Sequence, residues 1–470
     1  MRNAEEQLRY AASVVPSARQ LAWQELEFYA FFHFGINTFT NREWGDGTES
    51  PALFAPDALD ADQWVETAKA AGMRGVILTC KHHDGFCLWP SAYTEHSVKN
   101  SPWKNGQGDV VQEVADACRR HGLKFGVYLS PWDRHDARYG TGKAYNDYYV
   151  SQLTELATNY GELFCFWFDG ACGEGQNGKK QVYDWPRYYE TVRRLQPNAV
   201  ISVCGPDVRW CGNEAGHCRA SEWSVVPAAL RDAERTAEKS QQADDGAFSR
   251  KFDSQDEDLG SREAIWDVEE LVWYPAEVDT SIRTGWFYHP EEDGAVRSAE
   301  ELLNIYLSAV GGNASLLLNI PPDTHGKIAV PDCAVLAELG VKLRSMFAKN
   351  ATEAARLTAS SVALGHPAED AVDGKAETFW QSAPGQTEAV LTLHFAAPQP
   401  VSTLVLGEQL TVGQRIEAGE VWADGKKQTA FTTVGHKRIC TIGPMAVQTL
   451  EVRITAARAE PALRLLAVYQ

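Results

Sequence analysis

The chain has 470 residues, of which 44% are hydrophobic and 23% are charged, as in an ordinary globular protein. This length allows two domains, one of which could be a large barrel. The net charge of −19 would repel a phosphate backbone, and no apolar run approaches the roughly 18 residues of a membrane span, so we expect neither nucleic acid nor a membrane as a partner.

The N-terminal segment MRNAEEQLRYAASVVP carries acidic side chains and no long apolar run. We therefore expect no signal peptide and a cytoplasmic protein. The ten cysteines lie mostly within apolar segments, and none forms a Cys-x-x-Cys pair. We expect them to be reduced and buried.

From residue 28 to residue 320, apolar strand-like runs alternate with amphipathic helical segments. The expected strands are 28–34, 75–80, 124–130, 163–169, 199–204, 221–226, 277–283 and 315–320. The expected helices are 60–72, 110–118, 149–160, 185–195, 298–310 and 332–349. About eight strand–helix repeats predict a (β/α)8, TIM-like barrel that occupies residues 1–350.

Two later segments differ from this pattern. Residues 237–264 are polar and acidic, which indicates a long surface loop. After residue 351, short alternating segments separated by turns predict an all-β domain, residues 351–470, with the form of a two-sheet sandwich. The segment DAVDGKAETFWQS, followed by LTLHF and VSTLVL, resembles the discoidin, or galactose-binding-like, sandwich. We expect it to pack on the barrel, with sugar binding as the alternative.

The fourth expected strand, LFCFWFDG, ends abruptly in a carboxylate. Strand alternation places Trp167 and Asp169 on one face. The indole offers a flat apolar platform to a sugar ring, and the carboxylate two residues later can reach an anomeric carbon. Taken alone, Asp169 could equally cap the next loop or pair with an arginine.

Other strand ends carry similar side chains, and in a barrel the working residues lie at the C-terminal ends of the strands. These residues are His33, Glu43 and Trp44 after the first strand, Lys81, His82, His83 and Asp84 after the second, Tyr128, Trp132, Asp133 and His135 at the third, and Arg209, Trp210 and Glu214 after the fifth. Neutral donors, aromatic plates and acids together suit a neutral polyhydroxylated ligand. Core packing does not readily explain five such strand ends.

Metal and serine chemistry are both disfavoured. His82 and His83 are neighbours in a strand and would point to opposite faces, and no carboxylate–histidine pair at helical spacing accompanies them. The chain contains no Gly-x-Ser-x-Gly. We expect no metal and no cofactor.

Several motifs stand together in the first two thirds of the chain: HFGINTF, REW at 42–44, ALDADQW at 58–64, KHHDGF, FWFDG, GWFYH at 285–289 and LLLNIPP at 316–322. They resemble glycoside hydrolase family 29, the α-L-fucosidases, over about residues 21–330. SPWDRHDARYG and GPDVRWCGNEAG are similar to the branch of that family that acts on α-1,3/1,4-linked fucose next to a second, branching sugar.

This resemblance implies a retaining exo-α-L-fucosidase in which Asp169 is the nucleophile and Glu214 the general acid/base. The residues expected to contact the substrate are His33, Glu43, Trp44, His82, His83, Tyr128, Asp133, Trp167, Arg209, Trp210 and Trp286. Glu222 also follows the fifth strand and is the alternative acid/base. The mechanism needs two carboxyl groups about 5–5.5 Å apart, with the pKa of the acid/base raised.

The expected partner is a fucosylated oligosaccharide, and the oligomeric state is left open. Three other functions remain: an α-L-fucosidase of broader linkage range, a related retaining exo-glycosidase for another deoxy or galacto-configured sugar, and a catalytically silent sugar-binding protein. The last would keep the aromatic platform and lose the carboxylate pair, and both carboxylates are present.

Overall fold

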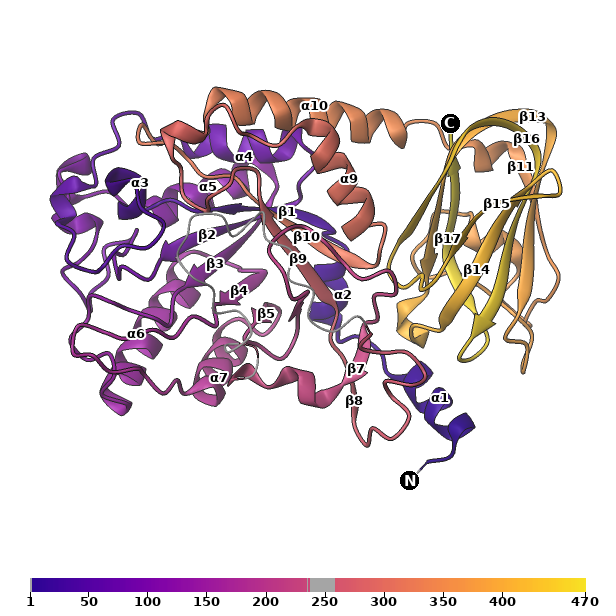
Figure 1. The fold of residues 1–470 in the computed structure, drawn as a ribbon, viewed down its shortest axis with the longest axis horizontal. Coiled ribbons are helices and arrows are strands. Elements are labelled where there is room, and N and C mark those ends of the chain that lie inside the picture. The colour runs from indigo at the N-terminus through magenta and orange to yellow at the C-terminus, as the bar shows by residue number, and fades with distance from the viewer. Residues whose placement is uncertain (1, 235, 237–257) are drawn as a thin grey trace.

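The computed structural model describes residues 2–234, 236 and 258–470. Figure 1 shows two bodies side by side, a strand–helix barrel and, in orange to yellow, an antiparallel β-sandwich. The expected fold class, a TIM-like barrel followed by a C-terminal β-sandwich, is confirmed. Among the described residues, no helix combines the length and the apolar character needed to cross a membrane.

The barrel sheet has eight strands, hydrogen-bonded in the order β5-β4-β3-β2-β1-β10-β9-β6. Their bounds are β1 Phe28–Phe32, β2 Gly75–Lys81, β3 Lys124–Leu129, β4 Cys165–Phe168, β5 Val200–Val203, β6 Arg209–Trp210, β9 Ala276–Ser281 and β10 Ala314–Asn319. Neighbouring strands are parallel throughout. A parallel bridge between Ser202 and Val208 links the two end strands, so the sheet forms a ring.

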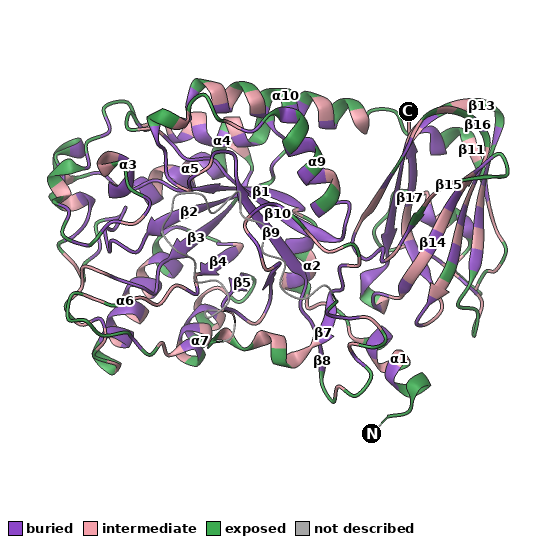
Figure 2. Ribbon diagram, viewed as in Figure 1, coloured by how far each residue is buried: buried purple, intermediate pink, exposed green. Residues whose placement is uncertain are grey.

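Helices surround this ring, with buried inner faces and exposed outer faces, whereas α1 lies beside the ribbon of β7 (Val225–Pro227) and β8 (Leu271–Trp273) (Figure 2). Their bounds are α1 Ala4–Ser13, α2 Ala18–Gln24, α3 Ile36–Thr40, α4 Ala61–Ala70, α5 Val110–His121, α6 Lys143–Asn159, α7 Trp185–Leu195, α9 Ala299–Ala309 and α10 Val330–Met346. Helix α5 illustrates how the sequence sets such bounds. The side chain of Asp109 caps its first turn, and Gly122 ends it with a left-handed backbone at φ 74°.

The expectation of a barrel strand at 221–226 is wrong. The sixth place in the ring belongs to β6, residues 209–210, while β7 (Val225–Pro227) pairs with β8 (Leu271–Trp273) in a separate antiparallel ribbon. A strand of two residues has no periodicity that a sequence could display, whereas SEWSVV alternates like a strand. Of the expected loop 237–264, residues 237–257 lie outside the described residues, and 258–264 form bends and turns.

The sandwich is built from one antiparallel sheet that folds over itself, in the order β12-β17-β13-β16-β14-β15 with β11 on β13. The bounds are β11 Ala355–Ala359, β12 Trp380–Gln381, β13 Ala389–Glu408, β14 Ile416–Ala423, β15 Lys426–Phe431, β16 Arg438–Ala457 and β17 Ala462–Tyr469. The long pair β13 and β16 shifts register twice, and such irregularities bend strands so that one sheet can supply two layers.

The barrel and the sandwich have separate apolar cores. They pack on each other, as expected. Sandwich residue Leu410 joins a small apolar cluster with Val225 and Trp273. Polar contacts add to it: His436 Nε2 lies 3.1 Å from Glu27 Oε1, Lys437 Nζ lies 2.5 Å from the same oxygen, and Arg464 pairs with Glu25 at 3.3 Å. None of the ten cysteines, all of which lie in described residues, is in a disulfide.

Candidate active site

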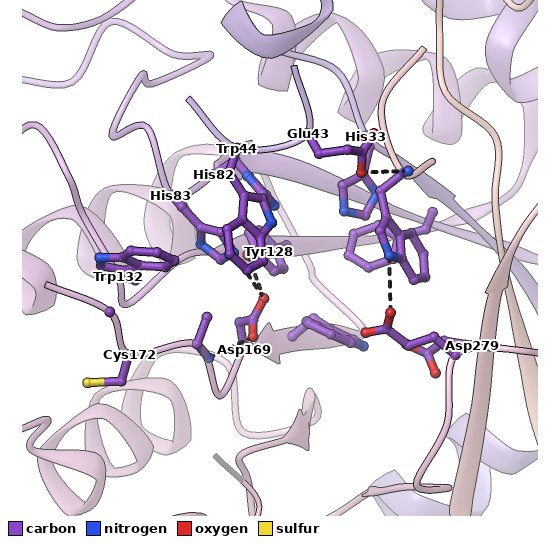
Figure 3. A pocket seen from close by; sticks show the side chains of 16 residues that line it. His33, Glu43, Trp44, His82, His83, Tyr128, Trp132, Asp169, Cys172 and Asp279 are labelled. Atoms are coloured by element: carbon purple, nitrogen blue, oxygen red, sulfur yellow. Dashed lines mark hydrogen bonds and ion pairs between the residues drawn. The ribbon is translucent and has the colours of Figure 1, made fainter. Parts of the chain in front are cut away.

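A cavity of about 180 Å³ opens at the C-terminal ends of the barrel strands (Figure 3). It is lined by Phe31, His33, Glu43, Trp44, His82, His83, Tyr128, Trp132, Trp167, Asp169, Ala171, Cys172, Gly173, Glu214, Asp279 and Trp286. These residues come from β1, β3, β4 and β9 and from the loops that follow β1 to β4, β6 and β9. Parallel strands bring side chains that are distant in sequence to one rim, which is why residues 33 to 286 meet here.

Most of the residues expected at the site line this cavity, including both members of the expected catalytic pair, Asp169 and Glu214. Asp133, Arg209 and Trp210 do not line it. Each of the three instead makes buried hydrogen bonds to residues outside or at the edge of the cavity.

Asp133 accepts a hydrogen bond from Lys81 Nζ at 3.0 Å inside the protein. Arg209 Nη2 donates to Glu222 Oε1 at 2.5 Å and to Trp223 O at 3.1 Å. Trp210 Nε1 donates to the Asp279 carboxyl group at 2.9 Å. Trp210 therefore contacts the cavity wall, because Asp279 itself lines the cavity.

Asp169 follows the end of β4 and faces the cavity with 21% of its side chain exposed. The Tyr128 hydroxyl donates to Oδ2 at 2.8 Å (Figure 3). The Ala171 backbone N–H donates to Oδ1 at 2.8 Å. The neighbouring Trp167 is fixed because its Nε1 donates to Glu277 Oε1 at 2.6 Å. The carboxylate is thus held in one orientation and remains open to a ligand.

Glu214 lies on the loop after β6 and is half-buried at the cavity wall. Loss of water around its carboxyl group, together with the nearby charge of Asp169, raises the pKa of Glu214 to about 8. Trp286 Nε1 donates to its Oε2 at 3.3 Å. At neutral pH this group therefore holds a proton that it can give to a ligand.

Glu222, the alternative acid/base, is fully buried and lies outside the cavity. Its two carboxylate oxygens are occupied by Arg209 at 2.5 Å and by the backbone N–H of Arg219 at 3.3 Å. An acid committed to a buried arginine cannot approach a leaving group. The geometry therefore favours Glu214 over Glu222.

His33 presents a hydrogen-bond acceptor to the cavity. Its Nδ1 lies 2.8 Å from Asn319 Oδ1, and the amide of Asn319 is oriented because its Nδ2 donates to Trp286 O at 2.7 Å. Nδ1 therefore carries the hydrogen, and the lone pair is on Nε2. Burial lowers the pKa of His33 to about 3, so the ring is neutral at physiological pH.

The same reasoning applies to His83. Ser130 Oγ uses its single hydrogen to donate to Trp132 O at 2.7 Å, so it accepts from His83 Nδ1 at 2.8 Å. His83 Nε2 is then an acceptor that lies 3.9 Å from Asp169 Oδ2. Burial lowers the pKa of His83 to about 4. His83 Nε2 and Asp169 Oδ2 are thus two neighbouring acceptors, to which a hydroxyl group of a ligand can donate.

The Glu43 carboxylate joins two loops of the rim. It accepts from the backbone N–H groups of Trp286 at 2.9 Å and Phe287 at 3.0 Å, and from His289 Nε2 at 2.6 Å. His289 Nδ1 lies 2.7 Å from Asn41 Oδ1, so both ring nitrogens face acceptors and both carry hydrogens. Burial opposes a charged ring, but the hydrogen bond and charge of Glu43, together with the charges of Glu292 and Glu291, outweigh it and raise the pKa of His289. The GWFYH motif contained this residue, although its role was not predicted.

Strand β9 contributes two buried acids that sequence reasoning missed, Glu277 and Asp279. Burial raises the pKa of Glu277 to about 7. Burial and the charge of Glu214 raise the pKa of Asp279 well above its usual range. Two acids two residues apart in an expected strand share a face, and that alternation was the available signal.

No group of three or more histidine, cysteine, aspartate or glutamate side chains is arranged to hold a metal ion in the part of the chain that the structure describes. The cavity instead offers acceptors, aromatic faces, one exposed carboxylate and one protonated acid. A carboxylate and a protonated carboxylic acid that share a barrel pocket with such side chains define a glycoside hydrolase.

The particular family follows from comparison with known proteins. Residues 18–345 match the family model described as alpha-L-fucosidase, and the chain belongs to this family. The resemblance to the α-L-fucosidases is confirmed, and so is the class of enzyme, a glycoside hydrolase with α-L-fucosidase activity.

Similar proteins match along nearly the whole chain. Alpha-L-fucosidase 1 of Arabidopsis thaliana is 38% identical, over 97% of this chain and 87% of that protein. A Bacteroides ovatus protein of known crystal structure is 47% identical in sequence, with a TM-score of 0.85. The match covers 100% of this chain and 76% of that chain. A Ruminococcus gnavus GH29 fucosidase in complex with fucose is 28% identical with a TM-score of 0.82, over 97% of this chain and 95% of that chain.

Proposed function

We propose that this protein is a retaining exo-α-L-fucosidase that removes α-1,3/1,4-linked fucose from Lewis-type oligosaccharides. The main support is the contrast between its two carboxyl groups. Asp169 is exposed to the cavity and held by two donors, whereas loss of water raises the pKa of Glu214 to about 8. Two acids in such different surroundings can serve as nucleophile and proton donor in one step. The fucose complex of the Ruminococcus gnavus relative supports fucose as the sugar.

In the first step, Asp169 attacks the anomeric carbon while Glu214 gives its proton to the leaving oxygen. The glycosidic bond breaks as the carbon–carboxylate bond forms, which yields a fucosyl ester of Asp169 and a free acceptor sugar. In the second step Glu214, now ionised, takes a proton from water, and the water oxygen displaces Asp169. Both residues return to their starting states, and fucose leaves with its original anomeric configuration.

The remaining side chains orient the sugar. His33 and His83 each present a neutral ring with an Nε2 lone pair, so both can accept hydrogen bonds from fucose hydroxyl groups. Glu43 is an acceptor fixed by three donors. The indoles of Trp167 and Trp286 supply apolar faces at the cavity wall. No step needs a cofactor.

The first product of hydrolysis tests the retaining mechanism. With an aryl α-L-fucoside, nuclear magnetic resonance during the first minutes should detect α-fucose before mutarotation produces the β anomer. Retention requires carboxyl groups about 5–5.5 Å apart, whereas inversion leaves room for a water molecule at roughly 6.5–9.5 Å. Initial accumulation of β-fucose would contradict the proposed mechanism.

The linkage preference has its own support. Trp132, Cys172 and Gly173 extend the cavity beyond Asp169, on the loops after β3 and β4. Trp132 lies in the segment SPWDRHDARYG and Glu214 lies in GPDVRWCGNEAG, the two segments that resemble the α-1,3/1,4 branch. An aromatic face in this extension of the cavity suits a second, branching sugar.

We therefore expect Lewis a and Lewis x trisaccharides to be cleaved with a kcat/KM at least about tenfold above that of 2′-fucosyllactose, which corresponds to about 1.4 kcal/mol of additional transition-state binding. Trp132→Ala should reduce this preference more than it reduces the hydrolysis of an aryl fucoside. Equal kcat/KM values across the panel would leave an α-L-fucosidase of broad linkage range.

A further inference from the structure

We infer that the C-terminal sandwich positions the acid/base loop, and that Gln414, Thr432 and Arg438 are positioning residues for catalysis. These three sandwich side chains hold the barrel segment Ala220–Ser224, which follows Glu214 by six residues. The inference rests on the proposed role of Glu214 as acid/base, and it gives the sandwich a catalytic purpose besides packing.

Two of these contacts belong to Gln414, which is fully buried between the short helix η9 (Leu410–Val412) and β14. Its Oε1 accepts from the Ser224 backbone N–H at 2.8 Å. Its Nε2 donates to Glu222 O at 3.2 Å. One sandwich side chain therefore satisfies a donor and an acceptor on the same stretch of barrel backbone, as a neighbouring β-strand would.

Two further sandwich residues converge on a single carbonyl. Thr432 Oγ1 donates to Ala220 O at 2.5 Å, and Arg438 Nη2 donates to the same oxygen at 3.3 Å. A fourth hydrogen-bonded link passes through Asn313 of the barrel. Its Nδ2 donates to Glu222 O at 2.8 Å, while its Oδ1 accepts from the His436 backbone N–H at 2.6 Å.

Residues 220–224 are connected by hydrogen bonds to the loop that carries Glu214. Glu222 accepts from Arg209 of β6 and from the backbone N–H of Arg219. Arg219 Nη1 in turn donates to Cys211 O at 2.8 Å. Asn213 folds the intervening turn, since its Nδ2 donates to His217 O at 2.9 Å. A displacement of residues 220–224 would therefore be transmitted to Glu214.

The loop needs this external support. Residues 211–224, all of which the structure describes, contain neither helix nor strand, and two glycines there, Gly212 and Gly216, adopt positive φ of 104° and 90°. Strand β6 before it is only two residues long. A general acid must lie within hydrogen-bond distance of the leaving oxygen, and a misplacement of about 1 Å can reduce the rate by about 10²-fold.

The test compares variants of the full-length protein on two aryl α-L-fucosides, one with a dinitrophenyl and one with a phenyl leaving group. Gln414→Met keeps the side-chain length and removes both hydrogen bonds. We expect it to lower kcat/KM for phenyl fucoside about tenfold or more and for dinitrophenyl fucoside less than about threefold, since only the poor leaving group requires protonation. Thr432→Val should act in the same direction, and Thr432→Ser, which keeps the hydroxyl, should restore wild-type values.

A matched control variant removes a different contact between the barrel and the sandwich. Arg262→Gln removes the ion pair with Glu417, which is exposed on the arginine side. Glu417 keeps its second partner, Arg458, at 3.2 Å, so the contact of Arg458 with the Trp223 ring should remain. This variant should leave the ratio of the two kcat/KM values unchanged. If Gln414→Met and Thr432→Val lower kcat/KM equally for both substrates, as a loss of folded protein would, the inference is wrong.

Glu214→Ala separates this inference from the proposed function. If the loss of kcat/KM in Glu214→Ala depends strongly on the leaving group and the loss in the sandwich variants does not, the proposed role of the sandwich is wrong and the acid/base assignment stands. If Glu214→Ala itself shows no such dependence, the acid/base assignment fails. Should Gln414→Met not fold, the pair Thr432→Val and Thr432→Ser, at a half-buried position, decides the question alone.

Discussion

Asp169→Asn is expected to lower kcat by a factor on the order of 10⁴–10⁶, because it removes the negative charge that attacks the anomeric carbon. The fold should be unchanged. The substitution keeps the size of the side chain, and the remaining carbonyl oxygen can still accept from the Ala171 N–H, which now donates at 2.8 Å. Steady-state kinetics on an aryl α-L-fucoside measure the loss, and thermal unfolding checks that the protein remains folded.

Binding of fucose provides the control for this variant. The His33, His83 and Glu43 contacts do not depend on the Asp169 charge, so calorimetry should still detect fucose with an affinity within about tenfold of the wild type, or 1.4 kcal/mol. Azide added to the variant should not restore the retained product, although attack on the opposite face can give an inverted fucosyl azide. A variant with a near wild-type rate would show that another group is the nucleophile.

Most of the barrel could be predicted because its strands are buried on both faces. All residues of β2 and β10 are buried, so both strands appear in the sequence as continuous apolar runs of strand length. Strand β6 has two residues, and its place in the ring depends on pairing with β9. Such a strand is specified by its partner and by the preceding turn, and a local pattern cannot predict it.

The site was predictable to the extent that it lies at strand ends. His33, Tyr128 and Asp169 each stand at or just beyond the end of an apolar run, where a barrel places its working residues. The supporting residues were harder to predict. A sequence gives the position of Arg209 but not the direction of its guanidinium group, which turns away from the cavity to Glu222. Likewise, His289 becomes significant only when Glu43 is seen beside it.

Long-range contacts account for the rest. Gln414 is 190 residues from Ser224 in the sequence, yet the two are hydrogen-bonded. No periodicity or motif connects them, because the contact exists only once the sandwich has docked on the barrel. Sequence reasoning therefore predicted a barrel followed by a sandwich, and it could not predict that a sandwich side chain is hydrogen-bonded to the barrel backbone at residues 222 and 224.

The roles of Glu214 and Glu222 can be separated because their surroundings predict different failures. Glu222 is buried beside Arg209, so Glu222→Ala leaves a buried guanidinium without its carboxylate, at a cost of about 3–5 kcal/mol of stability. Glu214→Ala removes no ion pair and should leave the thermal midpoint nearly unchanged. We expect Glu222→Ala to lower the free energy of unfolding and to reduce activity on all substrates in parallel.

Glu214→Ala should instead act on the chemistry, and most strongly where the leaving group needs a proton. Hydrolysis of a Lewis trisaccharide should fall by about 10²–10⁴-fold, and that of a dinitrophenyl fucoside much less. The pH profile gives a second measure. In the wild type the proton donor is present below the pKa of Glu214 and is lost as the pH rises through about 8, so kcat/KM should decline above that pH. In Glu214→Ala this decline should disappear, because the group that titrates is gone. If Glu222→Ala flattens the basic limb and Glu214→Ala retains it, the acid/base is Glu222.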